Sequence, residues 1–203
     1  MSRMAAKDRR EALIAAAIRV MVRDGVAKTT TRAIVNEAGM ALGVFHYCFD
    51  SREQLLQEVI TRITDHNVAV ARKAFAGAGD LNSMLTRSLA TFWEGVEQEP
   101  GQHLVGYELA HYALRQEGFE EIARRQYAQY LEAHEVLLTE GASNAGIRWA
   151  EPIPVLARYL NAILDGLVLC WLVDRNSEQS REVLRLATDH LMTLALEPSK
   201  LRD

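Results

Sequence analysis

Proline, glycine and cysteine are all scarce in this chain of 203 residues. Only 4 prolines and 12 glycines are present, which favours long uninterrupted helices over a β-sandwich with many turns. The two cysteines, Cys48 and Cys170, lie far apart and lack the C-x-x-C spacing of a redox or metal motif. A reducing cytoplasm is therefore the expected compartment. The chain is long enough to bury a core without disulfides or metals.

Long apolar runs and a secretion signal are missing as well. The most apolar stretch, residues 159–173, is interrupted by Asn161 and Asp165 and is short for a membrane span. We expect a buried helix there and no membrane partner. The N-terminal segment MSRMAAKDRREAL has no apolar region of the kind that signal peptides contain.

Motifs of catalysis and cofactor binding are also absent. The sequence has no GxSxG, no HExxH and no P-loop, so we expect neither an enzyme nor a bound cofactor. Glu108 and His111 form a single E-x-x-H pair, the spacing found in di-iron helical bundles. Such a site needs a second pair and further glutamates, so we expect no metal.

Charge is divided unevenly along the chain. Residues 1–63 contain 10 Lys and Arg against 7 Asp and Glu, a net charge of +3, whereas residues 64–203 carry −7. A basic front and an acidic rear indicate two different tasks. The balance of 49% hydrophobic and 25% charged residues excludes a disordered chain.

Helical periodicity runs through the whole sequence and predicts an all-α fold of about nine helices. Glycines, prolines and capping residues mark where the helices end. The expected helices span residues 5–23, 31–39, 41–49, 51–75, 81–97, 103–115, 120–139, 155–173 and 178–196.

The second and third of these helices are short and are separated by a tight turn at Ala38, Gly39 and Met40. Two helices joined by such a turn form the helix-turn-helix layout of DNA-binding proteins. This pair is too short to bury a core by itself, so the first helix has to cover it. We expect Phe45 and Phe49 to point into that core.

The stretch from Arg10 to Leu55 resembles the DNA-binding domain of the TetR family of transcriptional repressors. The resemblance implies a three-helix DNA-binding domain over residues 1–52 and a helical effector-binding and dimerisation domain over residues 53–203. It also implies a bacterial cytoplasmic protein that joins the nucleoid when it binds DNA. The matching residues are Ala16-Ala17, Gly25, Thr29-Thr30-Thr31, Ile34, Ala38-Gly39, Gly43, Phe45, Phe49, Ser51, Glu53, Leu55 and, in the rear, Leu164-Asp165-Gly166-Leu167 with Trp171.

The resemblance places the helix beginning near Leu42 in the major groove of DNA, its first residues facing base edges. The chain departs from the family pattern at Ala41, where Ser or Thr is usual, at His46, where Tyr is usual, and at Arg52, where Lys is usual. The expected DNA-binding residues are Thr30, Thr31, Arg32, Ala41, Leu42, Gly43, Val44, His46, Tyr47 and Arg52.

Basic residues at the start of the chain form a second group of expected DNA contacts. We expect Arg3, Lys7, Arg9 and Arg10 to form an arm on the DNA backbone or in the minor groove.

Aromatic and polar residues recur at matching intervals on the middle helices. Their convergence would form an apolar cavity with a few orienting polar groups, which is where the family encloses its effector. Ordinary packing is the alternative for each of these side chains. The expected ligand-binding residues are Phe92, Trp93, Tyr107, Glu108, His111, Tyr112, Tyr130, His134 and Trp171.

The last two helices are expected to form a subunit interface, because the first of them is apolar nearly all round. Two helices from each protomer would build a four-helix bundle with two-fold symmetry. Burial of that helix inside one subunit is the alternative. The expected interface residues are Leu160, Leu164, Leu167, Trp171, Val183, Ala187, Leu191 and Leu194.

Together these features predict a homodimeric repressor that binds a palindromic operator on double-stranded DNA and is released by a small, largely apolar effector. The alternative is a helical interaction or carrier protein that does not bind DNA. The basic front with its tight double-helix turn favours the repressor.

Overall fold

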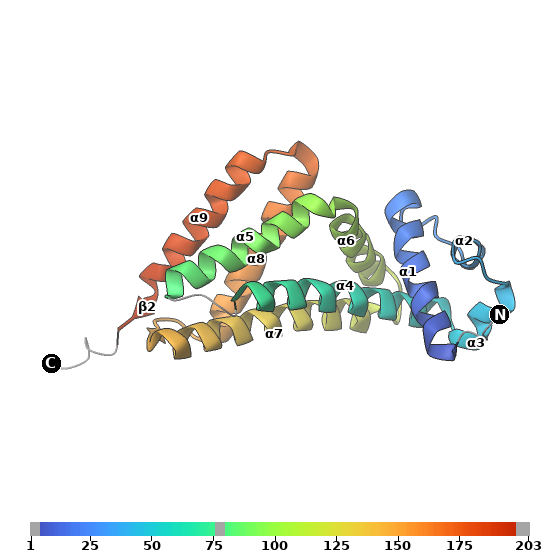
Figure 1. Cartoon of the computed structure of the whole chain (residues 1–203), viewed down its shortest axis with the longest axis horizontal. Helices are drawn as coiled ribbons and strands as arrows, with labels where there is room; N and C mark the ends of the chain where they lie inside the picture. Colours follow the sequence, from blue (N-terminus) through green and yellow to red (C-terminus); the bar gives the residue numbers. More distant parts are fainter. Residues whose placement is uncertain (1–4, 76–79, 198–203) are drawn as a thin grey trace. The chain divides into compact units, whose positions relative to one another are not determined.

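The computed structural model describes residues 5–75 and 80–197 of the chain (Figure 1). Nine helices and one two-stranded sheet make up this described part, which confirms the all-α prediction. The helices are α1 (Ala6–Asp24), α2 (Thr31–Glu37), α3 (Leu42–Cys48), α4 (Arg52–Phe75), α5 (Leu81–Gln98), α6 (Pro100–Arg115), α7 (Glu120–Ala145), α8 (Ile153–Asp174) and α9 (Ser177–Thr193).

The helix boundaries differ from the sequence prediction by up to three residues, and the end of α7 differs by six. α6 begins at Pro100 instead of residue 103, because a proline is tolerated in the first turn, where its missing N–H is not needed. α7 continues through Gly141, which is buried, and ends at Ala145, just before Gly146, whose φ of 62° places it in the left-handed region. A glycine inside a helix costs only about 1 kcal/mol, so packing outweighs it at position 141.

The contacts divide the chain into two compact units. The first, called the head below, comprises residues up to Asp65 together with Pro100–Gln126, and the second comprises His66–Glu99 and Tyr127 onward. The head therefore includes α1, α2, α3 and α6. This division by contacts does not test the functional boundary expected after residue 52, which stays a prediction.

The head is held together by one face of α1. Leu13, Ala17 and Met21 lie on that face and are buried, in the helical spacing that the sequence showed. Phe45 and Phe49 are buried in the same cluster, as predicted, with their ring centroids 5.4 Å apart. α3 has seven residues and is too short to be stable alone, so this packing is what keeps it helical.

The second unit is built on α5, α8 and α9, and α5 lies beside α9 (Figure 1). Trp93 of α5 and Trp171 of α8 meet edge to face, with ring centroids 5.7 Å apart. Buried Trp149 donates from Nε1 to the Leu138 carbonyl at 3.0 Å. It belongs to strand β1 (Arg148–Trp149), which pairs antiparallel with β2 (Ala195–Leu196), a small sheet that the sequence analysis did not predict.

α8 is longer than the apolar stretch considered in the sequence. By length and composition alone it could cross a membrane. One of its faces is buried in the second unit, however, and Asn161 on that face donates to Asp165 one turn further on. Buried core helices of soluble proteins pass the same test of length and composition.

Phe49→Ala is expected to lower the free energy of unfolding of the head by about 3–5 kcal/mol, the usual cost of removing a buried aromatic ring. Denaturant unfolding followed by circular dichroism measures this change. Tyr47→Ala, at an exposed residue two positions before Phe49, is the matched control and should shift stability by no more than about 0.5 kcal/mol. Equal losses in the two variants would contradict this account of the head's core.

Candidate nucleic-acid interface

The turn between α2 and α3 closes through backbone hydrogen bonds. The N–H of Met40 donates to the Val35 carbonyl at 2.8 Å, and the N–H of Gly39 donates to the Asn36 carbonyl at 3.1 Å. This pair of bonds is a Schellman motif, which needs a residue of positive φ at its centre, and Gly39 supplies it with φ 64°. The angle between the two helices is therefore fixed by Gly39.

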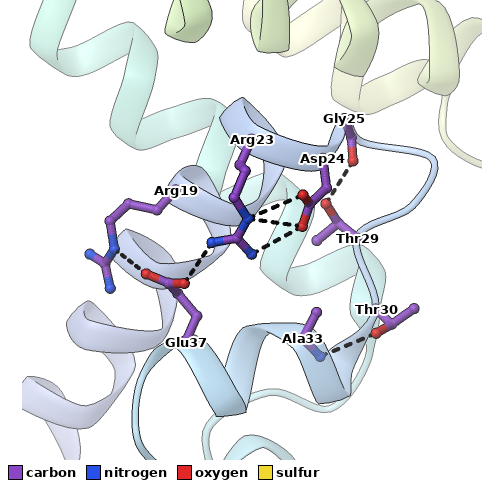
Figure 2. Close-up of polar contacts among 8 residues, drawn as sticks. All are labelled: Arg19, Arg23, Asp24, Gly25, Thr29, Thr30, Ala33 and Glu37. Atoms are coloured by element: carbon purple, nitrogen blue, oxygen red, sulfur yellow. Dashed lines mark hydrogen bonds and ion pairs between the residues drawn. The ribbon is translucent and has the colours of Figure 1, made fainter.

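The start of α2 is capped by a threonine of the predicted run (Figure 2). Thr30 accepts at its Oγ1 from the Ala33 N–H at 3.1 Å, while buried Thr29 donates from Oγ1 to the Gly25 carbonyl at 2.8 Å. Thr30 and Arg32 remain exposed and Thr31 is half-buried. The hydroxyl groups thus order the loop before α2 and present its first turn to solvent.

Glu37, at the end of α2, fastens this helix to α1 (Figure 2). Its carboxylate accepts from Nε of Arg19 at 2.8 Å and from Nη1 of Arg23 at 2.9 Å. These two guanidinium groups hold the pKa of Glu37 below its ordinary value. Arg23 also pairs with Asp24 at 3.0 Å. The charges of Arg19, Arg23 and Glu37 therefore pair with one another and hold α1 and α2 together.

The solvent-facing side of α3 carries the residues expected to meet DNA. Ala41, Leu42, Gly43, His46 and Tyr47 are exposed, Tyr47 by 70% of its surface. No side chain caps the helix at Ala41, so its first amides are available to an outside acceptor.

Two details of this helix surface concern single side chains. Val44 is half-buried and packs partly against the head core. The guanidinium of Arg9 lies 5.3 Å from the Tyr47 ring centre, so this arginine is held beside the surface of α3.

Two basic residues expected at the interface are engaged inside the head instead. Arg52 donates to the Tyr112 hydroxyl at 3.1 Å and to the Val26 carbonyl at 3.2 Å. Arg10 donates to Glu58 at 2.9 Å and to the Cys48 carbonyl, and it stacks on Phe49. These donors are hydrogen-bonded within the head, and contact of Arg52 and Arg10 with DNA stays a prediction.

The expected arm begins before the described part of the chain. Lys7 and Arg9 lie in α1, Lys7 exposed and Arg9 half-buried, so both belong to a helix of the head. Arg3 lies outside the described residues.

α6 packs within the head, against α1. Glu108 accepts at Oε2 from the Val26 N–H at 2.6 Å. Since Arg52 donates to the Val26 carbonyl, both backbone polar groups of Val26 are hydrogen-bonded to side chains. A Cβ at Gly101 would lie 2.6 Å from Cγ1 of Val22, which shows how closely α6 approaches α1.

Four expected ligand-binding residues therefore lie in the head. These are half-buried Tyr107, Glu108 and Tyr112, and exposed His111. The E-x-x-H pair serves the head, and the described residues contain no group of three or more potential metal ligands.

The second unit contains a cavity of about 40 Å³. Two of the expected ligand-binding residues, Phe92 and His134, line it. Trp93 and Trp171 pack on each other, and Tyr130 packs edge to face on Tyr127 at 6.2 Å. The full lining is Leu85, Ser88, Leu89, Phe92, His134, Leu137, Leu138, Leu160 and Leu164.

A chain of polar side chains leads away from this cavity. His134 is hydrogen-bonded to Asn161, Asn161 Nδ2 donates to Asp165 at 3.1 Å, and Tyr127 is hydrogen-bonded to Asp165. Desolvation lowers the pKa of His134 to about 4 and raises that of Asp165. It also raises the pKa of Tyr127 to about 12. The sequence analysis noted Asn161 and Asp165 as interruptions of an apolar stretch, and that was the available signal for this network.

Most of the residues expected at the subunit interface pack within the protomer. Leu160, Leu164, Trp171, Ala187 and Leu191 are buried, Leu167 and Leu194 are half-buried, and only Val183 is exposed. Some large apolar side chains of α8 and α9 are exposed to solvent, away from the buried side of these helices. They are Val155, Leu169, Val173, Val183 and Leu186. Of the predicted interface residues, Val183 belongs to this exposed apolar set, and the subunit interface itself stays a prediction.

Two protein-family models match this chain, one in its N-terminal part and one in its C-terminal part. The family described as bacterial regulatory proteins, tetR family, matches residues 13–59. The family described as BetI-type transcriptional repressor, C-terminal, matches residues 82–196, which is more than half of the chain. The chain belongs to the tetR family.

Individual relatives of this TetR-family protein agree with that assignment. The nicotine-responsive repressor HdnoR of Paenarthrobacter nicotinovorans is 28% identical over 89% of this chain and 92% of its own. A TetR-family regulator from Rhodococcus sp. has a TM-score of 0.80 at 23% identity, over 91% of this chain and 98% of its own. The multidrug binding protein EbrR, complexed with imidazole, has a TM-score of 0.64 at 28% identity, over 88% and 94%.

The family membership sets the class of this protein. Members of the tetR family are DNA-binding transcriptional regulators of the cytoplasm, and the curated relative is a repressor and not an enzyme. The helix-turn-helix of α2 and α3 is the element through which such a regulator contacts DNA.

Glu37→Gln is expected to lower the melting temperature of this TetR-family regulator at pH 7, because it removes the charge that Arg19 and Arg23 share. Since the folded pKa of Glu37 lies below 4.5, its contribution is present above pH 4.5 and is lost as the pH falls through the lowered pKa. Thermal melts of both proteins between pH 7 and pH 3 should therefore converge at the acid end.

The control for this melt series is Glu140→Gln, an exposed glutamate on α7. That variant should follow the wild-type curve at every pH. A difference for Glu37→Gln that stays constant down to pH 3 would contradict the role given to the ion pairs.

Proposed function

We propose that the chain is a homodimeric transcriptional repressor that binds a palindromic operator and releases it when a small, largely apolar effector binds. The observation that carries this proposal is the exposed surface of α3, set by the Gly39 turn, in a chain whose two parts both match the tetR family. The bound repressor would be part of the nucleoid.

Docking of α3 in the major groove would use its exposed face. Leu42 and half-buried Val44 suit thymine methyl groups, and Gly43 permits close approach of the backbone. Thr30, Thr31 and Arg32 at the start of α2 suit phosphates, as do His46, Tyr47 and the first amides of α3 beside Ala41. α3 has no Lys or Arg, so it does not offer the arginine contact by which many proteins recognise guanine.

The homodimer would form through the exposed apolar stripe of α8 and α9. Val155, Leu169 and Val173 are exposed on one side of α8, and Val183 and Leu186 are exposed on α9. A two-fold axis through this stripe would give two equal heads. Their half-sites would be expected about 34–36 Å apart, or a multiple of that spacing.

The effector would occupy the cavity lined by Phe92 and His134. HdnoR is described as nicotine-responsive and EbrR as binding several drugs, so two relatives respond to or bind small molecules. An effector weakens operator binding only if it has different affinities for the two conformations of the dimer. A tenfold to hundredfold loss of operator affinity requires about 1.4–2.7 kcal/mol of coupling.

Transmission to the head would run through α4 and α6. α4 contributes residues to both units, and α6 holds residue 26 directly through Glu108. Because residue 26 lies in the loop between α1 and α2, a shift of α6 would move the loop that precedes the DNA-contacting helices.

Arg32→Ala is expected to weaken binding to the operator equally for all sequence variants of the site. It should also reduce the slope of log affinity against log salt by about 1, as loss of one phosphate contact does. Fluorescence anisotropy with DNA from upstream of the protein's own gene, between about 50 and 200 mM salt, measures both effects. Arg87→Ala, an exposed arginine on α5, is the matched control and should leave the slope unchanged.

The absence of salt-dependent binding to any genomic fragment would contradict the proposal. It would favour the alternative of a helical interaction or carrier protein without DNA binding.

Val173→Asp is expected to convert the dimer into monomers, because it puts a charge on a side chain that is 82% exposed in the protomer but buried in the proposed interface. Sedimentation velocity measures the change. Leu114→Asp on α6, where the leucine is also mostly exposed, is the control and should leave the dimer intact. A wild-type protein that sediments as a monomer would contradict the proposed assembly.

A further inference from the structure

Two residues that line the small cavity of the second unit each have a buried polar atom without a hydrogen-bond partner in the protein. Its lining is apolar except for Ser88 on α5 and His134 on α7. The Oγ of Ser88 and the Nδ1 of His134 are both buried and have no hydrogen-bond partner. A buried polar atom without a partner is unfavourable by about 1–3 kcal/mol, so two of them in one cavity indicate an outside partner.

The surroundings of His134 decide which of its nitrogens carries the proton. Asn161 donates from Nδ2 to Asp165, which leaves the amide oxygen of Asn161 to accept from the His134 ring. Since Nδ1 has no hydrogen-bond partner, we assign the interaction with Asn161 to Nε2. A neutral imidazole that donates from Nε2 has an accepting lone pair at Nδ1. Desolvation keeps the ring neutral near pH 7, because it lowers the pKa of His134 to about 4.

We propose that this cavity selects an uncharged effector whose apolar body carries an O–H or N–H donor, which Nδ1 of His134 accepts while the Ser88 hydroxyl binds the same polar head. The inference rests on the proposed effector site and adds the chemistry of its occupant.

The lining excludes charged occupants. No carboxylate lines the cavity, and the carboxyl of Asp165 is already hydrogen-bonded to Asn161 and Tyr127, so an ammonium group would be buried without a counter-charge. An anion would find only the Ser88 hydroxyl as a donor and would face the lone pair of His134. The apolar remainder of the lining, which is leucine and Phe92, suits a hydrocarbon or aromatic body.

The small volume of the cavity means that binding an effector requires a conformational change in the protein. A cavity of about 40 Å³ holds little more than a water molecule, whereas benzene occupies a cavity of about 150 Å³. An aromatic effector therefore enters only when lining side chains move apart. The two hydrogen bonds offset part of that cost, and they give the effector a higher affinity for the opened arrangement than for the closed one.

The test uses the full chain without DNA and three probes of similar size: phenol, toluene and benzylammonium. In isothermal titration we expect phenol to bind about tenfold more tightly than toluene, the effect of one hydrogen bond to a buried partner, and benzylammonium not to bind. In His134→Phe the preference for phenol over toluene should fall, because only the Ser88 hydroxyl remains to bind the polar head. His111→Phe, the same change at an exposed position on α6, should retain it.

A spectroscopic measurement covers the case in which His134→Phe fails to fold. In the wild-type protein, saturation with phenol should shift the ¹⁵N resonance of His134 Nδ1, because the nitrogen gains a donor, whereas toluene should leave it unchanged. Equal affinity for phenol and toluene, tighter binding of benzylammonium, or no saturable binding of phenol in the millimolar range would each overturn the inference. These outcomes leave operator binding untouched, so failure here is distinguishable from failure of the proposed function.

Discussion

Burial of two phenylalanines under α1 is the interaction on which the rest of the head depends. α3 has only seven residues and no side-chain cap, so neither its length nor its ends stabilise it. Phe45 and Phe49 anchor it from below and leave the opposite face to solvent. The Schellman turn at Gly39 then sets its direction relative to α2. A helix that could not persist alone thereby becomes a rigid surface.

Charge in the head is used mainly for cohesion. Arg19, Arg23 and Glu37 join α1 to α2, and Arg52 with Glu108 holds residue 26 from both sides. The positive balance of the first 63 residues consequently overstates what is available to phosphates. Lys28 and Arg32 remain exposed near the start of α2, and the amides of α3 add partial charge of the same sign.

The sequence predicted local features well and long-range partners poorly. Helix positions, the turn at Gly39 and the two buried phenylalanines follow from periodicity and turn chemistry, which act over a few residues. The roles of Arg52 and Glu108 depend on partners 26 and 82 residues away, and no spacing rule encodes them. α8 is apolar on every side, so its pattern could not distinguish the inward stripe of Leu160 and Leu164 from the outward one of Leu169 and Val173. Ser88 showed no sequence signal, because its importance lies in a missing partner.

The separation of the two faces of α3 has a consequence for how such a protein diversifies. The exposed side chains Leu42, His46 and Tyr47 lie outside the buried core cluster, so exchanging them leaves that core unchanged. A duplicated gene can therefore accumulate substitutions at these positions and acquire new target sequences while the inward anchors stay as they are.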